Sequence, residues 1–282
     1  QTNDKSEIDK LLDGLDLNIE YATPEPTVEK INMEKTYPDS ILNRLLPHYR
    51  FYNNKGISDS TLSFFKGGLA TEGAMYQRFV FPIYDMNEQI HGFSGRNMTL
   101  ENSKRPKWKH VGKKSNWIYP FYIPGRANEH PVRESILSTR EVILIESIGD
   151  LLSLHERGIK NALAIFGTSL SSSLLCFLVS LGLEKIIISL NNDCNKEKNR
   201  GEIGALKIYL KLLNYFDKDK LIIHLPNKND FGEMDEEDFS SWHLSRGEID
   251  STSGQKNWHQ KILSLIESGD IARSLYKKKY FK

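Results

Sequence analysis

The sequence has few cysteines and no long apolar run among its 282 residues. Its two cysteines, Cys176 and Cys194, cannot build a disulfide framework or a four-cysteine zinc site. No apolar stretch is long enough to span a bilayer, and the opening residues QTNDKSEIDK lack the basic and apolar regions of a signal peptide. We therefore expect a cytoplasmic protein without membrane contact.

A strong net charge is also lacking, because 38 Lys and Arg residues nearly balance 37 Asp and Glu residues. The distribution is nevertheless uneven. Residues 104–114 (KRPKWKHVGKK) carry six cations and no acid, whereas residues 233–238 (EMDEED) are acidic. A local basic patch with interleaved aromatic residues is typical of a surface that attracts nucleic acid.

Composition and periodicity divide the chain into four parts. Residues 1–35 are polar and contain two prolines, which indicates a tether with one short amphipathic helix near residues 8–15. A mixed α+β subdomain at 36–138, a strand-and-helix unit at 139–230 and a charged helical region at 231–282 follow. The predicted fold class is α/β: an α+β N-terminal subdomain, a Rossmann-like parallel sheet and a small C-terminal helical region.

Regular patterns predict the elements of the two middle parts. Residues 76–96 alternate as a β-hairpin around the polar turn MNEQ. In the next unit, expected strands alternate with expected helices: strands at 141–147, 161–168, 184–191 and 220–226, and helices at 150–158, 171–182 and 204–216. Strands separated by helices of this length pair in parallel.

Acids follow three of the expected strands. Glu146, Asp193 and Asp230 each lie at a strand end, and Asp150 lies one helical turn after Glu146. The carboxyl ends of parallel strands meet at one edge of a sheet, so these acids can converge there. A hard divalent cation, Mg²⁺ or Mn²⁺, would relieve their mutual repulsion. Any one of them, taken alone, is better explained as a helix cap.

Short motifs around these acids occur in a defined order along the chain: Glu146 with Gly149 and Asp150, then FGTSL at 166–170, then an apolar strand that ends in N-N-D. This order resembles the Toprim domain of DnaG-type primases, topoisomerases and some nucleases. The stretches ISDSTLSFFKGGLA and MYQRFVFPIYDMNEQIHGFSGRNM, at 57–70 and 75–98, are similar to segments that precede Toprim in bacterial and bacteriophage DnaG-type primases. The collinear resemblance covers roughly residues 40–235.

The resemblance implies a reaction and a set of roles. DnaG-type primases use Mg²⁺ to join ribonucleoside triphosphates into a short RNA primer on a single-stranded DNA template. By motif position, Glu146, Asp150 and Asp193 are the expected catalytic residues, and Glu146, Asn191, Asp193 and Asp230 are the expected metal ligands. Asn191 replaces the first acid of the Toprim D-x-D pair, and the insertion CNKEKNR at 194–200 follows the pair. Both departures predict weaker metal binding.

The expected nucleic-acid residues lie upstream of these acids. Two arginines of the hairpin match the family pattern, and the basic stretch supplies the rest: Arg78, Arg96, Lys107, Trp108, Lys109, Lys113 and Lys114. Surface salt bridges explain either arginine equally well, and a solvated loop with tryptophan buried against the sheet remains the alternative for the basic stretch.

Two further partners follow from the resemblance alone. A zinc-binding module that reads the template cannot be built from two cysteines, so we expect it either upstream of the Gln1 tether in a longer chain or as a separate protein that acts in trans. The G-x-x-x-x-G-K-[ST] motif of a fused helicase is absent, so a separate helicase partner is expected. A bacteriophage origin is expected. Two other functions stay open, namely a Toprim nuclease and a catalytically impaired single-stranded-DNA-binding module.

Overall fold

The structure is a computed structural model that describes residues 35–99, 104–125, 129–248 and 255–277. The predicted tether at 1–35, with its short helix near residues 8–15, lies almost entirely outside the described residues. Those that are described belong to one compact unit of the chain.

An antiparallel sheet of five strands forms the first part, in the order β1-β2-β3-β4-β5. Its strands are β1 (Leu45–Leu46), β2 (Gly68–Ala70), β3 (Arg78–Tyr84), β4 (Ile90–Asn97) and β5 (Trp108–Val111). The predicted hairpin is confirmed by β3 and β4, with Phe81 opposite Ser94. Short helices accompany the sheet: η1 (Asp39–Arg44), α2 (Arg50–Asn53), α3 (Asp59–Phe64), η2 (Gly73–Met75) and η3 (Lys114–Asn116).

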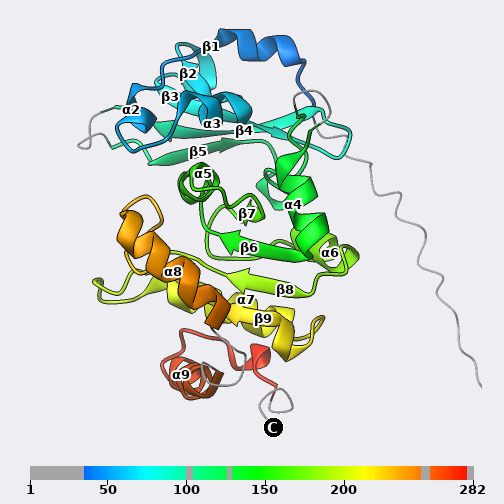
Figure 1. Cartoon of the computed structure of the whole chain (residues 1–282), viewed down its shortest axis with the longest axis vertical. Coiled ribbons are helices and arrows are strands. Elements are labelled where there is room, and N and C mark those ends of the chain that lie inside the picture. Colours follow the sequence, from blue (N-terminus) through cyan, green and yellow to red (C-terminus); the bar gives the residue numbers. More distant parts are fainter. Residues whose placement is uncertain (1–34, 100–103, 126–128, 249–254, 278–282) are drawn as a thin grey trace, which may run out of the picture. The chain divides into compact units, whose positions relative to one another are not determined.

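A parallel sheet of four strands forms the second part, in the order β7-β6-β8-β9. Its strands are β6 (Glu141–Ile145), β7 (Ala162–Ala164), β8 (Lys185–Ile188) and β9 (Leu221–Ile223). The intervening helices are α4 (Pro131–Thr139), α5 (Ile148–Glu156), α6 (Ser172–Ser180), α7 (Arg200–Leu212) and η4 (Lys218–Lys220). Figure 1 shows β6 and β8 side by side within this sheet. The predicted alternation and parallel pairing are thus confirmed.

The packing on both faces of strand β6 explains why its sequence is a continuous apolar run. Ile143 and Ile145 pack into one hydrophobic cluster, which also contains buried residues of the antiparallel sheet. Val142 and Leu144 pack into a second cluster with α6 and α7. Successive side chains of a strand point to opposite faces, so a sheet that is covered on both faces needs apolar residues at every position.

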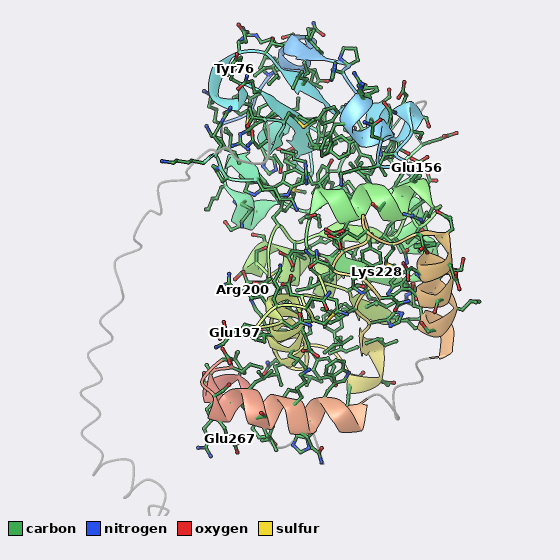
Figure 2. The ribbon with its side chains drawn as sticks, turned by 90° about the vertical axis from the view of Figure 1, so that its left-hand side faces the viewer. Tyr76, Glu156, Glu197, Arg200, Lys228 and Glu267 are labelled. Atoms are coloured by element: carbon green, nitrogen blue, oxygen red, sulfur yellow. The ribbon has the colours of Figure 1, made fainter. Side chains whose placement is uncertain are left out.

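Hydrogen bonds join the parallel part to the preceding part of the chain. The backbone N–H of Ala164 donates to the carbonyl of Tyr119 at 2.9 Å, which extends the sheet edge beyond β7. At the end of α5, the Glu156 carboxylate accepts hydrogen bonds from the Ser58 N–H at 3.0 Å and the Ser58 hydroxyl at 2.9 Å. Ser58 is the N-cap of α3, so Glu156 fixes the start of that helix. Figure 2 labels Glu156 at the end of its helix, α5.

Helices α8 (Glu236–Glu248) and α9 (Gln255–Glu267) and the short η5 (Arg273–Leu275) make up the C-terminal region. Trp242 of α8 is buried and stacks on His224, with ring centroids 5.2 Å apart, so α8 is anchored beside the end of β9. No helix in the described ranges is long and apolar enough to cross a membrane.

The sequence patterns did not predict strands β1, β2 and β5. The first two are only two and three residues long and lie in a region expected to be helices and loops. Strand β5 lies inside the basic stretch and pairs with β4, so that Trp108 faces Arg96. The lysines between Lys104 and Lys114 hide the period of two that its Trp108 and His110 would otherwise display.

Candidate active site

The turn after β6 is built by a reciprocal cap. The Ser147 hydroxyl accepts the N–H of Asp150 at 3.5 Å, and the Asp150 carboxylate accepts the Ser147 N–H at 3.1 Å. The same carboxylate accepts the Ser147 hydroxyl at 2.7 Å. This capping box starts α5 immediately after Glu146 and holds the Glu146 backbone at the sheet edge.

Asp150 also reaches the loop after β9. Its second carboxylate oxygen accepts the N–H of Phe231 at 3.3 Å. Burial, and next the charge of Asp230, raise the pKa of Asp150 to about 7, although hydrogen bonds from Ser147 and Phe231 act in the opposite direction. Asp150 is thus a buried support that positions the Asp230 loop.

The turn after β8 is fixed by one asparagine. The Asn199 side chain accepts the N–H groups of Asp193 and Glu202, both at 3.0 Å, and donates to the Asn192 side chain at 2.8 Å. Asn199 is therefore both the N-cap of α7 and the brace of the 191–193 turn.

A close backbone approach adds to this brace. A Cβ atom on Gly201 would lie 1.8 Å from the carbonyl oxygen of Asn191, so only glycine fits there. The Asn192 N–H donates to the Asn229 carbonyl at 2.8 Å, and the Asn192 side chain donates to the Pro226 carbonyl at 3.0 Å. These bonds hold the loop that carries Asp230 beside the 191–193 turn.

A cavity of about 210 Å³ opens where the two sheets meet. Its polar lining comes from both parts of the fold: Glu146, Asn191 and Asp230 from the parallel sheet, and Lys107, Trp108 and His110 from the antiparallel sheet. The acids at the ends of the parallel strands therefore face Lys107, the residue before β5, and the aromatic rings of Trp108 and His110 on β5.

The electrostatics of Glu146 reflect this crowding. Burial, and next the negative charge of Asp193, raise the pKa of Glu146. A hydrogen bond from the Asn191 backbone and the charges of Lys107 and Lys196 oppose that shift without cancelling it. Burial and the repulsion of Asp193 thus both disfavour the charged form of the Glu146 carboxylate.

Asp193 does not line this cavity. It is buried, and its carboxylate forms an ion pair with Lys196 of the 194–200 insertion, which raises the pKa of Lys196. Of the four expected metal ligands, the cavity thus brings together Glu146, Asn191 and Asp230. Across the described ranges, no three Asp, Glu, His or Cys side chains are grouped as ligands of one ion.

Arg78, which was expected to contact nucleic acid, lies inside the fold. Its side chain is buried, and its guanidinium donates to the carbonyls of Gly95, at 3.0 Å, and Pro106, at 3.1 Å. Arg78 therefore ties the residues before β5 to β4, and its burial does not suit direct contact with nucleic acid.

The other basic residues are placed in different ways. Arg96 stacks over the rings of Phe51, at 5.0 Å, and Trp108, at 5.9 Å, so it links the cavity to α2. The ammonium groups of Lys109 and Lys114 donate to the carbonyls of Ala74 and Phe166, each at 2.7 Å. Lys113 is exposed.

His110 is a cavity residue to which the sequence assigned no separate role. Burial, and next the charges of Lys114 and Arg78, lower its pKa to about 4, so the imidazole is neutral at pH 7. Its position two residues after Trp108 places both rings on one face of β5. This spacing of two is the sequence pattern that could have identified His110 as a cavity residue, but the surrounding lysines obscure it.

Comparisons with known proteins agree with this fold. A family model described as Toprim-like matches residues 143–234. The DNA primase of Helicobacter pylori is 30% identical over 193 residues, which cover 67% of this chain and 30% of that protein. The Escherichia coli primase catalytic core aligns with TM-score 0.54 and 17% identity, over 71% of this chain and 72% of that chain. A DnaG primase catalytic domain bound to single-stranded DNA aligns with TM-score 0.56 and 16% identity, over 73% and 76%.

These similarities define the class of protein: the chain carries a Toprim-like domain within the catalytic-core fold of primases. In sequence and in fold the chain is similar to the DnaG-type primases. The predicted fold class, a mixed α+β subdomain followed by a Toprim sheet, is confirmed. The chain spans about 30% of the length of the curated relatives it matches.

Proposed function

We propose that this chain is the catalytic core of a DNA primase, which joins ribonucleoside triphosphates into a short RNA primer on a single-stranded DNA template. The observation that carries the proposal is the cavity in which Glu146, Asn191 and Asp230 face Lys107 and Trp108. Primer synthesis needs acids for a metal ion, a cation for phosphate and a flat surface for a base, and this cavity supplies all three.

The acids of the cavity fit a divalent cation, Mg²⁺ or Mn²⁺. Glu146, Asn191 and Asp230 offer oxygen donors, which hard cations prefer. Burial, and next the repulsion of Asp193, raise the pKa of Glu146, and such an ion would relieve that repulsion. A bound ion would stabilise the charge that develops on the triphosphate during transfer. Asp193 belongs to this set by motif position, and Asp150 supports it.

The chain's own residues supply the remaining functions. Glu146 directly follows β6 at the cavity wall, where it accepts the proton of the attacking hydroxyl as a general base. Lys107 binds phosphate oxygens of the incoming nucleotide at the cavity wall. Neutral His110 offers a hydrogen bond without adding charge.

The template follows the aromatic and basic face beside the cavity. Arg96 lies between Phe51 and Trp108, and rings of this kind stack on bases without reading their sequence. The DnaG catalytic domain solved with single-stranded DNA has the same fold, which supports this choice of template. Lys109, Lys113 and Lys114 add positive charge along the same segment. A replicative helicase, a separate zinc-binding module and a bacteriophage origin belong to the same proposal.

A DNA-binding module without turnover is the second candidate. Asn191 in place of an acid and the pairing of Asp193 with Lys196 favour it, because both reduce the charge available to a metal. A Toprim nuclease is the third, and the primase-like antiparallel sheet argues against it.

One gel separates the three functions. Labelled single-stranded DNA is incubated with ribonucleotides and Mg²⁺ or Mn²⁺, using the wild type, Glu146→Gln and, as a matched control, Glu197→Gln. Glu197 is an exposed acid of the insertion (Figure 2). Short RNA made by the wild type and the control, but not by Glu146→Gln, would support the primase. Shortened DNA would indicate the nuclease, and unchanged DNA without RNA would indicate the binding module.

A further inference from the structure

The insertion at 194–200 brings a cation back onto the 191–193 turn. The Lys196 N–H donates to the Asp193 carbonyl at 2.9 Å, which closes a tight turn directly after the acid. The Lys196 ammonium then donates to the Asp193 carboxylate. Asn199 fixes the other end of this loop through the Asp193 N–H.

The two partners of this pair differ in exposure. The Asp193 side chain is 11% exposed, whereas that of Lys196 is 64% exposed. The ammonium therefore covers a carboxylate that has little other access to water.

Two features in which this chain departs from the Toprim pattern reduce the negative charge of the 191–193 turn. Asn191 removes one negative charge from the turn, and Lys196 neutralises a second one at Asp193. Lys196 also lies near enough to Glu146 to influence its ionisation. Each change reduces the number of cations that the site needs in order to reach neutrality.

We propose that the Lys196 ammonium is a built-in cation that holds Asp193 and keeps a divalent ion from that carboxylate, so the chain binds its divalent ion through Glu146, Asn191 and Asp230. This inference rests on the proposed metal site. An ammonium tethered three residues from its acid has an effective concentration in the millimolar range or above, so it competes well with free Mg²⁺.

The inference predicts what removal of the ammonium does. Without Lys196, the buried Asp193 carboxylate lacks its counterion, and a divalent cation is the natural replacement because it prefers carboxylate oxygens. Lys196→Ala should therefore bind about one additional Mn²⁺ per chain. Lys196→Arg keeps the charge and should bind like the wild type.

Lys198 offers a matched control. It lies in the same insertion and is similarly exposed, but its ammonium pairs with Asp270, at 2.9 Å, and not with the acids of the site. Lys198→Ala removes the same charge from the loop. It should leave the number of bound Mn²⁺ ions unchanged, which separates the local effect at Asp193 from a change in net charge.

The test is a Mn²⁺ titration of the full chain followed by electron paramagnetic resonance of the free ion. The expected result is one added ion for Lys196→Ala and none for Lys196→Arg or Lys198→Ala, with Asp193→Asn retaining the wild-type ion. If Lys196→Ala matches the wild type while Glu146→Gln loses its ion, the inference fails and the proposed metal site stands. Loss of the ion in Asp193→Asn also overturns it. If the wild type and Lys196→Ala both bind no Mn²⁺, the metal site and the inference fail together.

Discussion

The carboxylate of Asp150 accepts the backbone N–H of Phe231 at 3.3 Å, which ties the first turn of α5 to the loop after β9. Residues 81 positions apart are thus joined directly. Since Asp230 precedes Phe231, the bond fixes where that acid stands relative to Glu146. A site made of strand ends depends on such links, because the loops themselves carry little regular structure.

The first prediction concerns pH. The pKa of Asp150 is about 7 in the folded chain, against ~3.9 for an unfolded aspartate, so the folded state binds the extra proton. This stabilisation is complete below about pH 4 and is lost as the pH rises through 7. Without metal, the free energy of unfolding should fall by on the order of 2–4 kcal/mol over that range. Urea unfolding at several pH values measures this loss.

Asp150→Asn is the control for that measurement. It removes the titrating group but keeps an oxygen acceptor at the capping position. Its difference in unfolding free energy between pH 4 and pH 7 should be smaller than that of the wild type. Equal pH dependence in both proteins would show that Asp150 does not carry the effect.

A second prediction concerns the bond between the two parts of the fold. Glu156→Ala removes the acceptor of the Ser58 N–H and hydroxyl, so the start of α3 loses its partner. We expect a loss of about 1–2 kcal/mol in unfolding free energy, measured by urea titration at pH 7. Glu267→Ala, an exposed acid on α9, should change stability by less than about 0.5 kcal/mol.

The same acid adds a pH test with the opposite sign. Burial alone would raise the pKa of Glu156, but hydrogen bonds from Thr61 and Ser58 lower it overall. A lowered acid pKa gives stability that is present above the unfolded value and is lost as the pH falls through the folded value. The difference between the wild type and Glu156→Ala should therefore shrink in acid, and a constant difference would contradict this origin.

The parallel sheet could be predicted because its signal is local. In β6, every position from Val142 to Ile145 is buried, and a run of that kind shows in the sequence without any knowledge of partners. The convergence of Glu146 and Asp230 followed from the rule that parallel strand ends share an edge. Neither inference required the position of a particular side chain.

The burial of Arg78 and the pairing of Lys196 could not be predicted in the same way. Arg78 is buried because the Pro106 carbonyl, 28 positions later, folds back onto it. Asp193 meets Lys196 because Asn199 shapes the loop between β8 and α7. Both depend on the path of a loop, and the spacing of residues does not encode that path.

A third prediction tests the backbone approach at α7. Gly201→Ala would place a methyl group 1.8 Å from the Asn191 carbonyl oxygen, so the 191–193 turn must shift. We expect a loss of about 2–4 kcal/mol in unfolding free energy. Gly149→Ala is the control, because its nearest neighbour is the Ser147 hydroxyl at 3.4 Å, an ordinary contact. Comparable thermal midpoints for the two variants would contradict the tight approach.

The last prediction concerns Trp108, which lines the cavity and lies beneath the Arg96 guanidinium. Trp108→Ala removes both the stacking surface and the partner of that guanidinium, so binding of single-stranded DNA should weaken by about 1–3 kcal/mol. Trp108→Phe keeps an aromatic face and should recover most of this loss. Fluorescence anisotropy with a labelled oligonucleotide, without metal, measures both affinities. If Trp108→Ala binds as tightly as the wild type, the template does not stack on β5, and the aromatic path must begin at Phe51.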